Sequence, residues 1–487
     1  MAVLLALGAA GCAVGPDYQR PAPPPGVDAP AFKESGMWTS ASPAVAAADS
    51  AWWQAYGDPQ LDALVEQANQ ASPTLAQAQA QYQQAQALLQ GARAAFYPTV
   101  GINISGQRAR SITNSVSSLG NSHAWSLQAS WEPDLWGGVR RSVEAAGDSA
   151  QASAADLAAA RLTVQAAVVN GYIQLRLDDE QQALYASTIE GYQKALALTQ
   201  AQHHAGVVTG ADVALAQNTL AAAQAEAIDL DLTRRQLEHA LAVLLGKTPS
   251  DFSLPVAPLT AKLSAPPPGL PSQLLERRPD IAAAERRVAA ANAQIGVAQA
   301  AYFPNLTLGA SGGYQGSGFG PWFLTPGRIW ALGAALAETL FDGGARSARV
   351  AQARAALDEA AATYRQTVLG GFQEVEDNLA ALGDLAHERA AQNEAARAAH
   401  VSAQVYLAQY RAGTTSYTSV VTAQAAALTA DRAVLQLRAR QFAASVALIK
   451  AVGGGWDASQ LAAVAGSSAS PLAVASAASA APDSSNK

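Results

Sequence analysis

The prolines of this chain leave two long stretches without a helix breaker. Of the 24 prolines, none lies between Pro133 and Pro249, and residues 327–470 contain none either. Ala and Gln, which favour helix, are frequent there, and apolar residues recur at three- and four-residue steps. A single helix over residues 138–204 would be roughly 100 Å long, at 1.5 Å per residue. No globular core is that deep, so the sequence predicts a long and narrow helical body.

Both stretches belong to an internal repeat with an offset of about 206 residues. The sequence Ala-Phe-Tyr-Pro at residues 95–98 returns as Ala-Tyr-Phe-Pro at residues 301–304. At the same offset, the Gly-Gly pair at residues 137–138 matches the pair at residues 343–344. Each half is predicted to contain a helix, a stop at the aromatic-proline pair, two strands, a Gly-Gly turn and two long helices joined by a glycine turn.

We expect the first structural repeat to span residues 51–260 and the second to span residues 261–460. The strands are expected near residues 99–108, 124–132, 305–315 and 329–338. The long helices are expected near residues 138–204, 210–246, 343–410 and 417–452. An extended N-terminal segment (residues 12–50), which is rich in proline at its start, precedes the repeats, and an Ala/Ser-rich tail (residues 461–487) that is predicted to be disordered follows them.

The predicted strands alternate between apolar and polar residues. Between the aromatic residues Trp125 and Trp131, Leu127 lies on the same face, whereas Ser, Gln and Glu occupy the other face. Residues 100–104 and 306–310 alternate in the same way. In the strand near residues 329–338, Ala and Gly are too frequent for the faces to be assigned. Aromatic residues at both ends of an apolar face are typical of strands that cross a membrane with one face toward lipid. A soluble hairpin with one buried face is the alternative interpretation.

Membrane crossing by these strands would require several copies of the chain. Beyond the N-terminus no run of about 18 apolar residues occurs, so no transmembrane helix is predicted. Four strands cannot close a barrel, and an open edge in lipid leaves backbone groups without hydrogen bonds. Three copies would supply twelve strands around an open lumen, whereas two would supply eight, whose side chains fill the interior.

The single cysteine, Cys12, follows a short apolar stretch that contains small residues. This order is typical of a bacterial lipoprotein signal, in which the peptidase cuts before a cysteine that carries lipid. We therefore expect residues 1–11 to be a signal peptide and Cys12 to be the site of lipid attachment. Because no Lys or Arg precedes the apolar stretch, the natural start is expected upstream. A buried free thiol is the alternative interpretation of Cys12.

Several motifs, in order along the chain, resemble the outer membrane efflux lipoproteins of the TolC/OprM family, NodT branch. They include Cys-Ala-Val-Gly-Pro-Asp-Tyr-Gln-Arg-Pro at residues 12–21, Leu-Glu-Arg-Arg-Pro-Asp-Ile at residues 275–281, and the segments at residues 51–61 and 340–344. The resemblance implies a mainly α-helical chain that trimerises into a twelve-stranded transmembrane β-barrel on a periplasmic α-helical barrel with an equatorial domain. It further implies the outer-membrane component of a tripartite RND-type efflux system, a passive conduit that exports small molecules such as drugs.

The resemblance also implies a location and partners. The chain is expected in the outer membrane of a Gram-negative bacterium, as a homotrimer in contact with outer-membrane lipid, a periplasmic adaptor (membrane fusion) protein and an inner-membrane efflux pump. No cofactor is expected apart from the covalent lipid on Cys12, and the net charge of −7 argues against nucleic acid as a partner. A structural or adhesive coiled-coil protein would explain the helices but not the strands. A periplasmic enzyme is disfavoured because no catalytic triad, metal-ligand spacing or phosphate loop is found.

By this resemblance, the turns at residues 205–212 and 411–419 are the periplasmic tips, where the tunnel narrows and adaptors dock. Gly206 and Gly413 are expected to supply the turn geometry. Family members carry acidic residues in the second tip, whereas this second tip contains no Asp or Glu and only the first keeps a carboxylate, that of Asp212. We therefore predict a gate held by packing and neutral hydrogen bonds, for which the candidate residues are Tyr410, Thr415, Tyr417 and Ser419.

Overall fold

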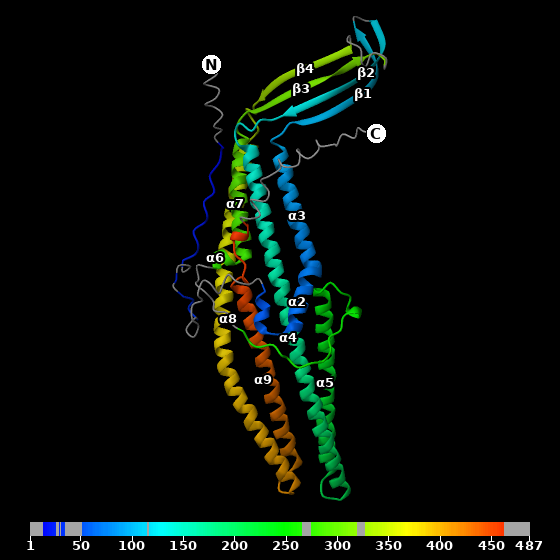
Figure 1. The fold of residues 1–487 in the computed structure, drawn as a ribbon, viewed down its shortest axis with the longest axis vertical. Helices are drawn as coiled ribbons and strands as arrows, with labels where there is room; N and C mark the ends of the chain where they lie inside the picture. The colour runs from blue at the N-terminus through cyan, green and yellow to red at the C-terminus, as the bar shows by residue number, and fades with distance from the viewer. Residues whose placement is uncertain are drawn as a thin grey trace, which may run out of the picture.

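The computed structural model describes residues 13–25, 29, 31–34, 51–113, 116–264, 274–318 and 327–461. These residues form a long helical body with a curved four-stranded sheet at one end (Figure 1). The expected signal peptide, Cys12 and the expected tail from residue 462 onward lie outside the described residues.

Short helices precede the strands in each half. They are η1 (Trp52–Tyr56), α2 (Pro59–Ala71) and α3 (Pro73–Ala94) in the first half, and α6 (Leu274–Arg277) and α7 (Pro279–Ala300) in the second, with η2 (Pro249–Asp251) between the halves. Helix α2 begins at a strong N-cap, because Asp58 Oδ1 accepts hydrogen bonds from the backbone N–H groups of Gln60 (3.0 Å) and Leu61 (3.3 Å). Pro73 and Pro279 occupy the first positions of α3 and α7, where a missing N–H costs nothing.

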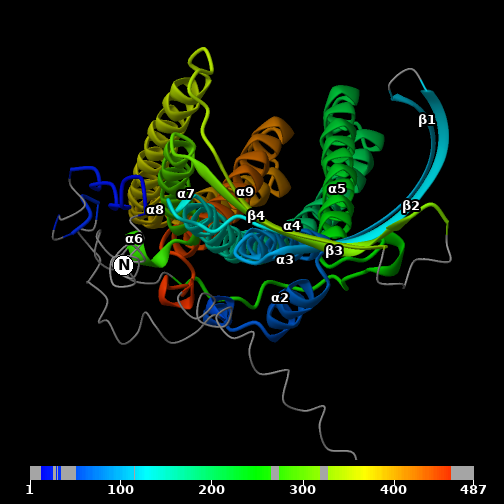
Figure 2. The ribbon, with the colours of Figure 1, turned by 90° about the horizontal axis from the view of Figure 1, so that it is seen from above.

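The four strands form one antiparallel sheet in the order β1-β2-β3-β4. Their bounds are Thr99–Thr113 for β1, Val116–Trp131 for β2, Asn305–Gly316 for β3 and Arg328–Ala337 for β4. Strands β1 and β2 are longer than the predicted segments at 99–108 and 124–132. Their distal parts are rich in Gly, Ser, Gln and Arg and show no clear alternation, yet backbone pairing continues from Gly106↔His123 to Thr113↔Val116. Seen from above, the sheet is an arc (Figure 2).

The strand register assembles one apolar face from all four strands. Ile102 lies opposite Leu127, which lies opposite Gly312, which lies opposite Trp330. Directly opposite residues of an antiparallel pair share a face. The register therefore assigns the faces of β4, which the sequence left open, and its apolar face carries Trp330, Leu332, Ala334 and Leu336.

Two helical hairpins extend from the strands to the far end of the molecule (Figure 1). The first consists of α4 (Gly138–His204) and α5 (Gly210–Leu244), and the second of α8 (Ala345–Arg411) and α9 (Tyr417–Ala451). Asp134 and Asp342 fix the starts of α4 and α8. The Asp134 carboxylate accepts hydrogen bonds from the backbone N–H of Val139 (3.0 Å), and the Asp342 carboxylate accepts one from the backbone N–H of Arg346 (3.0 Å). Each strand pair thus continues directly into a hairpin.

The largest hydrophobic core lies midway along the body, where η1, α2 and the segment at residues 252–261 pack on α4, α5 and α9. A buried ion network fixes this segment. Asp179 on α4 accepts from Arg176 Nη1 (2.9 Å) and from Arg234 Nε on α5 (2.6 Å). The same two guanidinium groups donate to the carbonyl oxygens of Pro255 (2.7 Å) and Leu254 (2.7 Å). The irregular segment therefore has two of its carbonyl groups satisfied without a strand of its own.

By length and composition, helix α4 is long and apolar enough to cross a membrane. The sequence predicted no such helix, because it contains no uninterrupted apolar run of sufficient length beyond the N-terminus. Its central residues Val168, Ile173 and Leu175 are buried in the core just described. The buried charged residues Arg176 and Asp179 follow them directly. Core helices meet the same criteria of length and composition, so this finding by itself assigns no membrane crossing to α4.

Gly206 and Gly246 have similar backbone conformations but different surroundings, so substituting each of them distinguishes backbone strain from a steric clash. Both have a positive φ, +74° and +69° respectively, which L side chains adopt only with strain. A Cβ at Gly246 would lie 2.3 Å from the carbonyl oxygen of Ala71, whereas a Cβ at Gly206 would meet nothing within 4 Å. We expect Gly206→Ala to lower the free energy of unfolding by about 1–2 kcal/mol.

Gly246→Ala is expected to cost clearly more than Gly206→Ala, because the carbonyl of Ala71 must also move. Urea unfolding of the detergent-solubilised protein, followed by far-UV circular dichroism, measures both changes. Equal losses for the two variants would contradict the packing of the end of α5 against the end of α2.

Candidate functional site

The two hairpin tips are built in the same way. The left-handed residues Gly206 and Gly413 follow the ends of α4 and α8, with φ of +74° and +75°. The N–H of Val207 donates to the carbonyl of Gln202 (2.9 Å), and the N–H of Thr414 donates to the carbonyl of Gln409 (3.0 Å). These bonds satisfy carbonyl groups that the helix ends leave open. Both predicted turns therefore reverse the chain through a glycine.

Asp212, the carboxylate of the first tip, belongs to the start of α5. Its Oδ2 accepts from the backbone N–H (3.0 Å) and from the hydroxyl (2.7 Å) of Thr209. The Thr209 hydroxyl oxygen in turn accepts from the N–H of Asp212 (3.4 Å). This reciprocal pair is a capping box, which satisfies two N–H groups of the helix start. Asp212 thus has a structural partner within its own turn.

The second tip carries hydroxyl groups in place of carboxylates. Ser416 Oγ lies 3.2 Å from Ser419 Oγ, and the Thr414 hydroxyl donates to the carbonyl of Gln409 (3.0 Å). Thr415 and Ser419 are half-buried. No charged side chain takes part in these contacts.

Tyr410 and Tyr417 join the two hairpins next to the tips. Their rings are 5.3 Å apart, and both are buried with Ala195, Ala216 and Val420 in one small cluster. The Tyr410 hydroxyl donates to Gln202 Oε1 on α4 and lies 3.5 Å from Thr199 Oγ1. Burial, followed by the neighbouring Tyr410, raises the pKa of Tyr417 to about 12.

The partners of Tyr410 were not identified from the sequence. Thr199 and Gln202 are three residues apart at the end of α4, so they share one face of that helix. This spacing was the one feature of the sequence that indicated a shared polar face at the end of α4. Two ion pairs that the sequence also did not reveal connect the hairpins nearer the middle of the body: Arg438 to Glu180 (2.6 Å), and Arg432 to Glu226 (3.7 Å).

The apolar face of the sheet is exposed in the single chain. Leu127 is 50% exposed and Trp330 is 74% exposed. Trp131 is 38% exposed, and its Nε1 donates to the carbonyl of Phe96 (3.0 Å). Trp125 packs on Tyr314 with their rings 5.5 Å apart. An apolar surface that covers several strands marks a contact with a membrane or with another protein.

The described N-terminal residues lie against the junction between strands and helices. The N–H of Val14 donates to the carbonyl of Trp136 (3.1 Å), and Asn292 donates to the carbonyl of Pro16 (2.9 Å). Arg141 on α4 pairs with Asp17 (2.9 Å). Val14, two residues after Cys12, is therefore held beside the base of the sheet.

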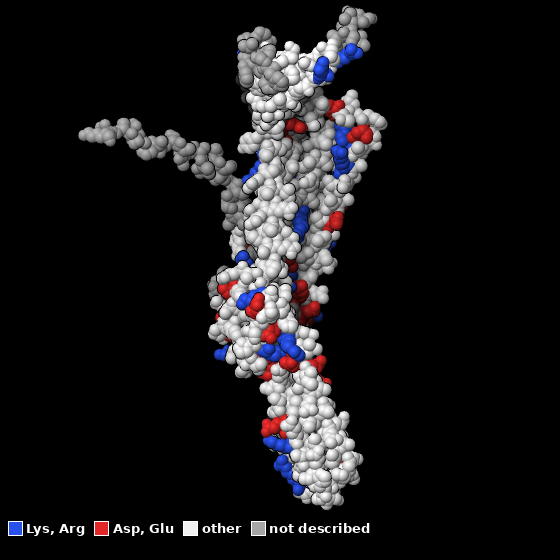
Figure 3. All heavy atoms as spheres, turned by 90° about the vertical axis from the view of Figure 1, so that its right-hand side faces the viewer, with Lys and Arg blue, Asp and Glu red and all other residues white. Residues whose placement is uncertain are grey.

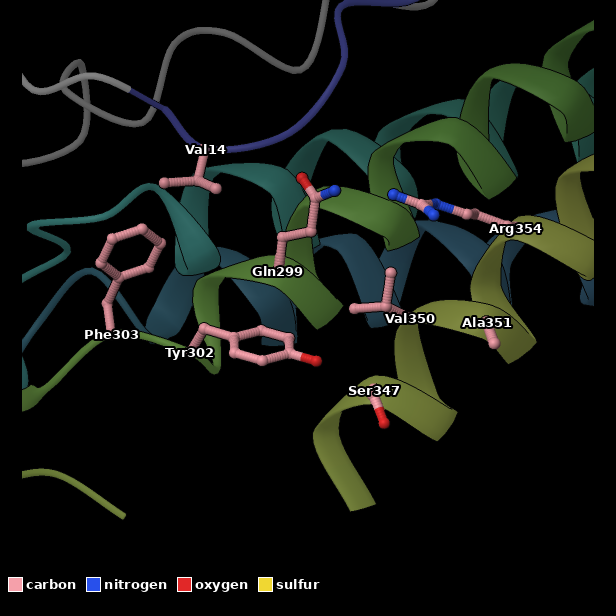
Figure 4. A pocket seen from close by; sticks show the side chains of 8 residues that line it. All are labelled: Val14, Gln299, Tyr302, Phe303, Ser347, Val350, Ala351 and Arg354. Carbon is pink, nitrogen blue, oxygen red and sulfur yellow. The ribbon is translucent and has the colours of Figure 1, made fainter. Parts of the chain in front are cut away.

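A cavity of about 490 Å³ adjoins this segment between the end of α7 and the start of α8 (Figure 4). Tyr302 and Phe303 flank it on the α7 side, Val350 and Arg354 line it on the α8 side, and Val14 closes one end (Figure 4). Among the described residues, no group of three or more His, Cys, Asp or Glu side chains is placed to hold a metal ion.

Comparison with known proteins gives one consistent family. Residues 64–247 and 270–454 match the family model described as outer membrane efflux protein. The pyoverdine export outer membrane protein OpmQ of Pseudomonas putida KT2440 is 34% identical over 450 residues, which cover 90% of this chain and 94% of that protein. The structure of the outer-membrane channel OprN has a TM-score of 0.84 at 29% identity, and the match covers 91% of this chain and 100% of that chain. The open-state structure of the MtrE outer membrane channel of Neisseria gonorrhoeae has a TM-score of 0.81 at 28% identity, with 92% and 99% covered. The chain belongs to the outer membrane efflux protein family.

Proposed function

We propose that this protein is the outer-membrane channel of a tripartite, RND-type efflux system, a passive conduit that exports small molecules such as drugs. The observation that carries the proposal is the exposed apolar face of a sheet whose strands continue into the helices α4 and α8, each roughly 100 Å long. A periplasmic adaptor and an inner-membrane pump are the proposed partners. The relatives support this function through their names, which describe export and efflux.

The proposed assembly is a trimer. The sheet is an arc whose edge strands are β1 and β4 (Figure 2). In lipid, the unpaired N–H and C=O groups of these edges would cost several kcal/mol each. Pairing β1 of one copy with β4 of the next removes the edges, and three copies supply a twelve-stranded barrel with an open lumen. The α-helical hairpins would then form a periplasmic tunnel beneath the barrel.

The proposed gate lies at the hairpin tips and is held by uncharged contacts. The hydrogen bond from Tyr410 to Gln202 ties the second hairpin to the first. Asp212 is engaged in a capping box, so we assign it to the stability of the turn rather than to a charged constriction. Opening would separate the hairpins and break the Tyr410 contact.

Single-channel recording in planar bilayers tests the proposal. We expect the purified wild-type protein to conduct ions in discrete steps, with mostly closed channels. Tyr410→Phe removes a hydrogen bond worth about 1 kcal/mol in each of three copies, so we expect the open fraction to rise by up to roughly 100-fold. Tyr417→Phe is the matched control, because the Tyr417 hydroxyl has no hydrogen-bond partner among the described residues.

Two results would count against this proposal. A stable oligomer that carries no current at any voltage would refute the channel. If Tyr410→Phe and Tyr417→Phe changed the open fraction equally, the contact to Gln202 would not be the gate.

The apolar face of the sheet is proposed to contact lipid. Leu127→Arg should then destabilise the folded protein by about 2–4 kcal/mol if this position lies near the bilayer midplane. Gln128→Arg, on the opposite face of the same strand, should be tolerated. Refolding into lipid vesicles at increasing urea concentration measures both free energies, and similar losses at the two positions would refute the assigned faces.

Cys12 is proposed to carry the lipid anchor. The hydrogen bond between Val14 and Trp136 holds the neighbouring residues at the base of the sheet, which is the proposed membrane surface. Mass spectrometry of the N-terminal peptide should show an acylated Cys12 as the first residue of the mature protein. An unmodified thiol with residues 1–11 still attached would contradict this prediction. Cys12→Ser should lose the lipid, yet it should still insert, because the strands have their own apolar face.

A further inference from the structure

The charges of the sheet are distributed unequally between its two ends. No Asp or Glu occurs within the four strands. Arg108 and Arg110 lie in the distal part of β1, and Arg328 begins β4. The acidic residues Glu132 and Glu338 lie at the opposite end, where the strands meet the helices. On the face seen in Figure 3, basic atoms and no acidic atoms are visible at the distal end of the sheet.

All three arginines lie on the apolar face. Arg108 and Arg110 follow Ile104 at two-residue steps, so they share its face. Arg328 lies opposite Tyr314, which lies opposite Trp125, which lies opposite Ile104. Arg328 is therefore next to the aromatic pair of Trp125 and Tyr314, and Arg108 and Arg110 lie farther along β1 beyond that pair.

These three side chains are exposed, and none of them forms an ion pair or hydrogen bond within the described residues. The arginines at the other end of the sheet differ in this respect. Arg140 pairs with Asp134 (3.1 Å), and Arg346 pairs with Asp342 (2.8 Å). The distal guanidinium groups thus present their donors to whatever surrounds this face.

The slant of the strands places Arg108 and Arg328 at a similar height, with Arg110 two residues farther along β1. Figure 1 shows the strands slanting across the long axis, with β4 above β1. We take the strands to be tilted by about 40° from the long axis. Strand β4 is three strand spacings of about 4.8 Å away from β1, so it lies roughly 9 Å higher than β1 along that axis. The four residues from Ile104 to Arg108 rise by roughly 10 Å along β1 at the same tilt. Arg328 and Arg108, at opposite edges of the sheet, therefore reach the same level.

We propose that Arg108, Arg110 and Arg328 form a basic rim that binds the phosphate groups of net-anionic lipids in the distal leaflet of the membrane. The guanidinium fork matches a phosphate group in geometry and charge. The exposed apolar band directly below the rim, which includes Trp330, fits the acyl chains of the same molecule. The ligand must therefore join phosphate to acyl chains. This inference rests on the proposed function, which orients the strands with their distal end away from the periplasm.

The test compares lipid binding by two triple variants with the same change in charge. Arg108→Gln, Arg110→Gln and Arg328→Gln are combined in the rim variant. The control variant combines Arg161→Gln on α4 with Arg349→Gln and Arg365→Gln on α8, three exposed arginines that also have no partner among the described residues. Native mass spectrometry of each detergent-solubilised oligomer measures binding of diphosphoryl lipid A, of its dephosphorylated form and of inorganic phosphate.

We expect the rim variant to bind diphosphoryl lipid A roughly 10- to 100-fold more weakly than wild type, and the control variant to bind as wild type does. The dephosphorylated form should bind all three proteins equally weakly. Inorganic phosphate should not displace the lipid, because it lacks acyl chains. Equal binding by the rim variant and wild type, equal losses in both variants, or displacement by inorganic phosphate would each overturn the proposal.

Conductance in neutral phosphatidylcholine bilayers separates this inference from the proposed function. A rim variant that conducts normally but binds the lipid weakly supports the rim. Absence of current in wild type would refute the channel, whereas a conducting rim variant with undiminished lipid binding would refute the rim alone. If the rim variant does not assemble, Arg328→Gln alone provides the same comparison with a smaller expected loss.

Discussion

The pairing of β2 with β3 is the contact on which the rest of the structure depends. It joins the two halves through nine residue pairs, from His123↔Gly316 to Trp131↔Leu308. The residues of each pair are far apart in the sequence. A shift of one residue would turn every side chain of one half to the opposite face. The observed register instead places Leu127 beside Trp330 on a single apolar surface. Because α4 follows β2 and α8 follows β4, which pairs with β3, the sheet also sets the two hairpins side by side.

The two halves repeat the same elements but are secured by different residues. In the first half, Arg176 and Arg234 hold the segment at residues 252–261 through Asp179 and backbone carbonyls. In the second, the buried Arg278 donates to Glu374 on α8 (2.7 Å) and to the carbonyl of Ala451 at the end of α9 (3.1 Å). Each hairpin is thus anchored midway by buried arginine side chains that pair with carboxylates and backbone carbonyls, which makes this region costly to rearrange.

The sequence was sufficient for the local elements and insufficient for contacts between distant segments. Absence of proline and the glycine turns at Gly206 and Gly413 indicated the long hairpins, because these are local constraints on the backbone. Strand alternation indicated the apolar face, but it ended before the polar distal parts of β1 and β2, where the backbone pairing continues. The partner of Tyr410 was missed because Gln202 is more than 200 residues away. The role of Cys12 remains a prediction, since it lies outside the described residues.

The strengths of the contacts along the body differ in a way that suits the proposed gate. Midway, breaking one partner of a buried ion network would leave an uncompensated charge, at a cost of about 3–5 kcal/mol. Near the tips, the hairpins are joined by the packing of Tyr410 and Tyr417 and by contacts between neutral groups, of which the hydrogen bond from Tyr410 to Gln202 is worth about 1 kcal/mol. In the proposed trimer, three such bonds would favour the closed state by roughly 100-fold. A partner that binds the open tips only a few kcal/mol more tightly than the closed tips would reverse this preference, while the middle of the body stays intact.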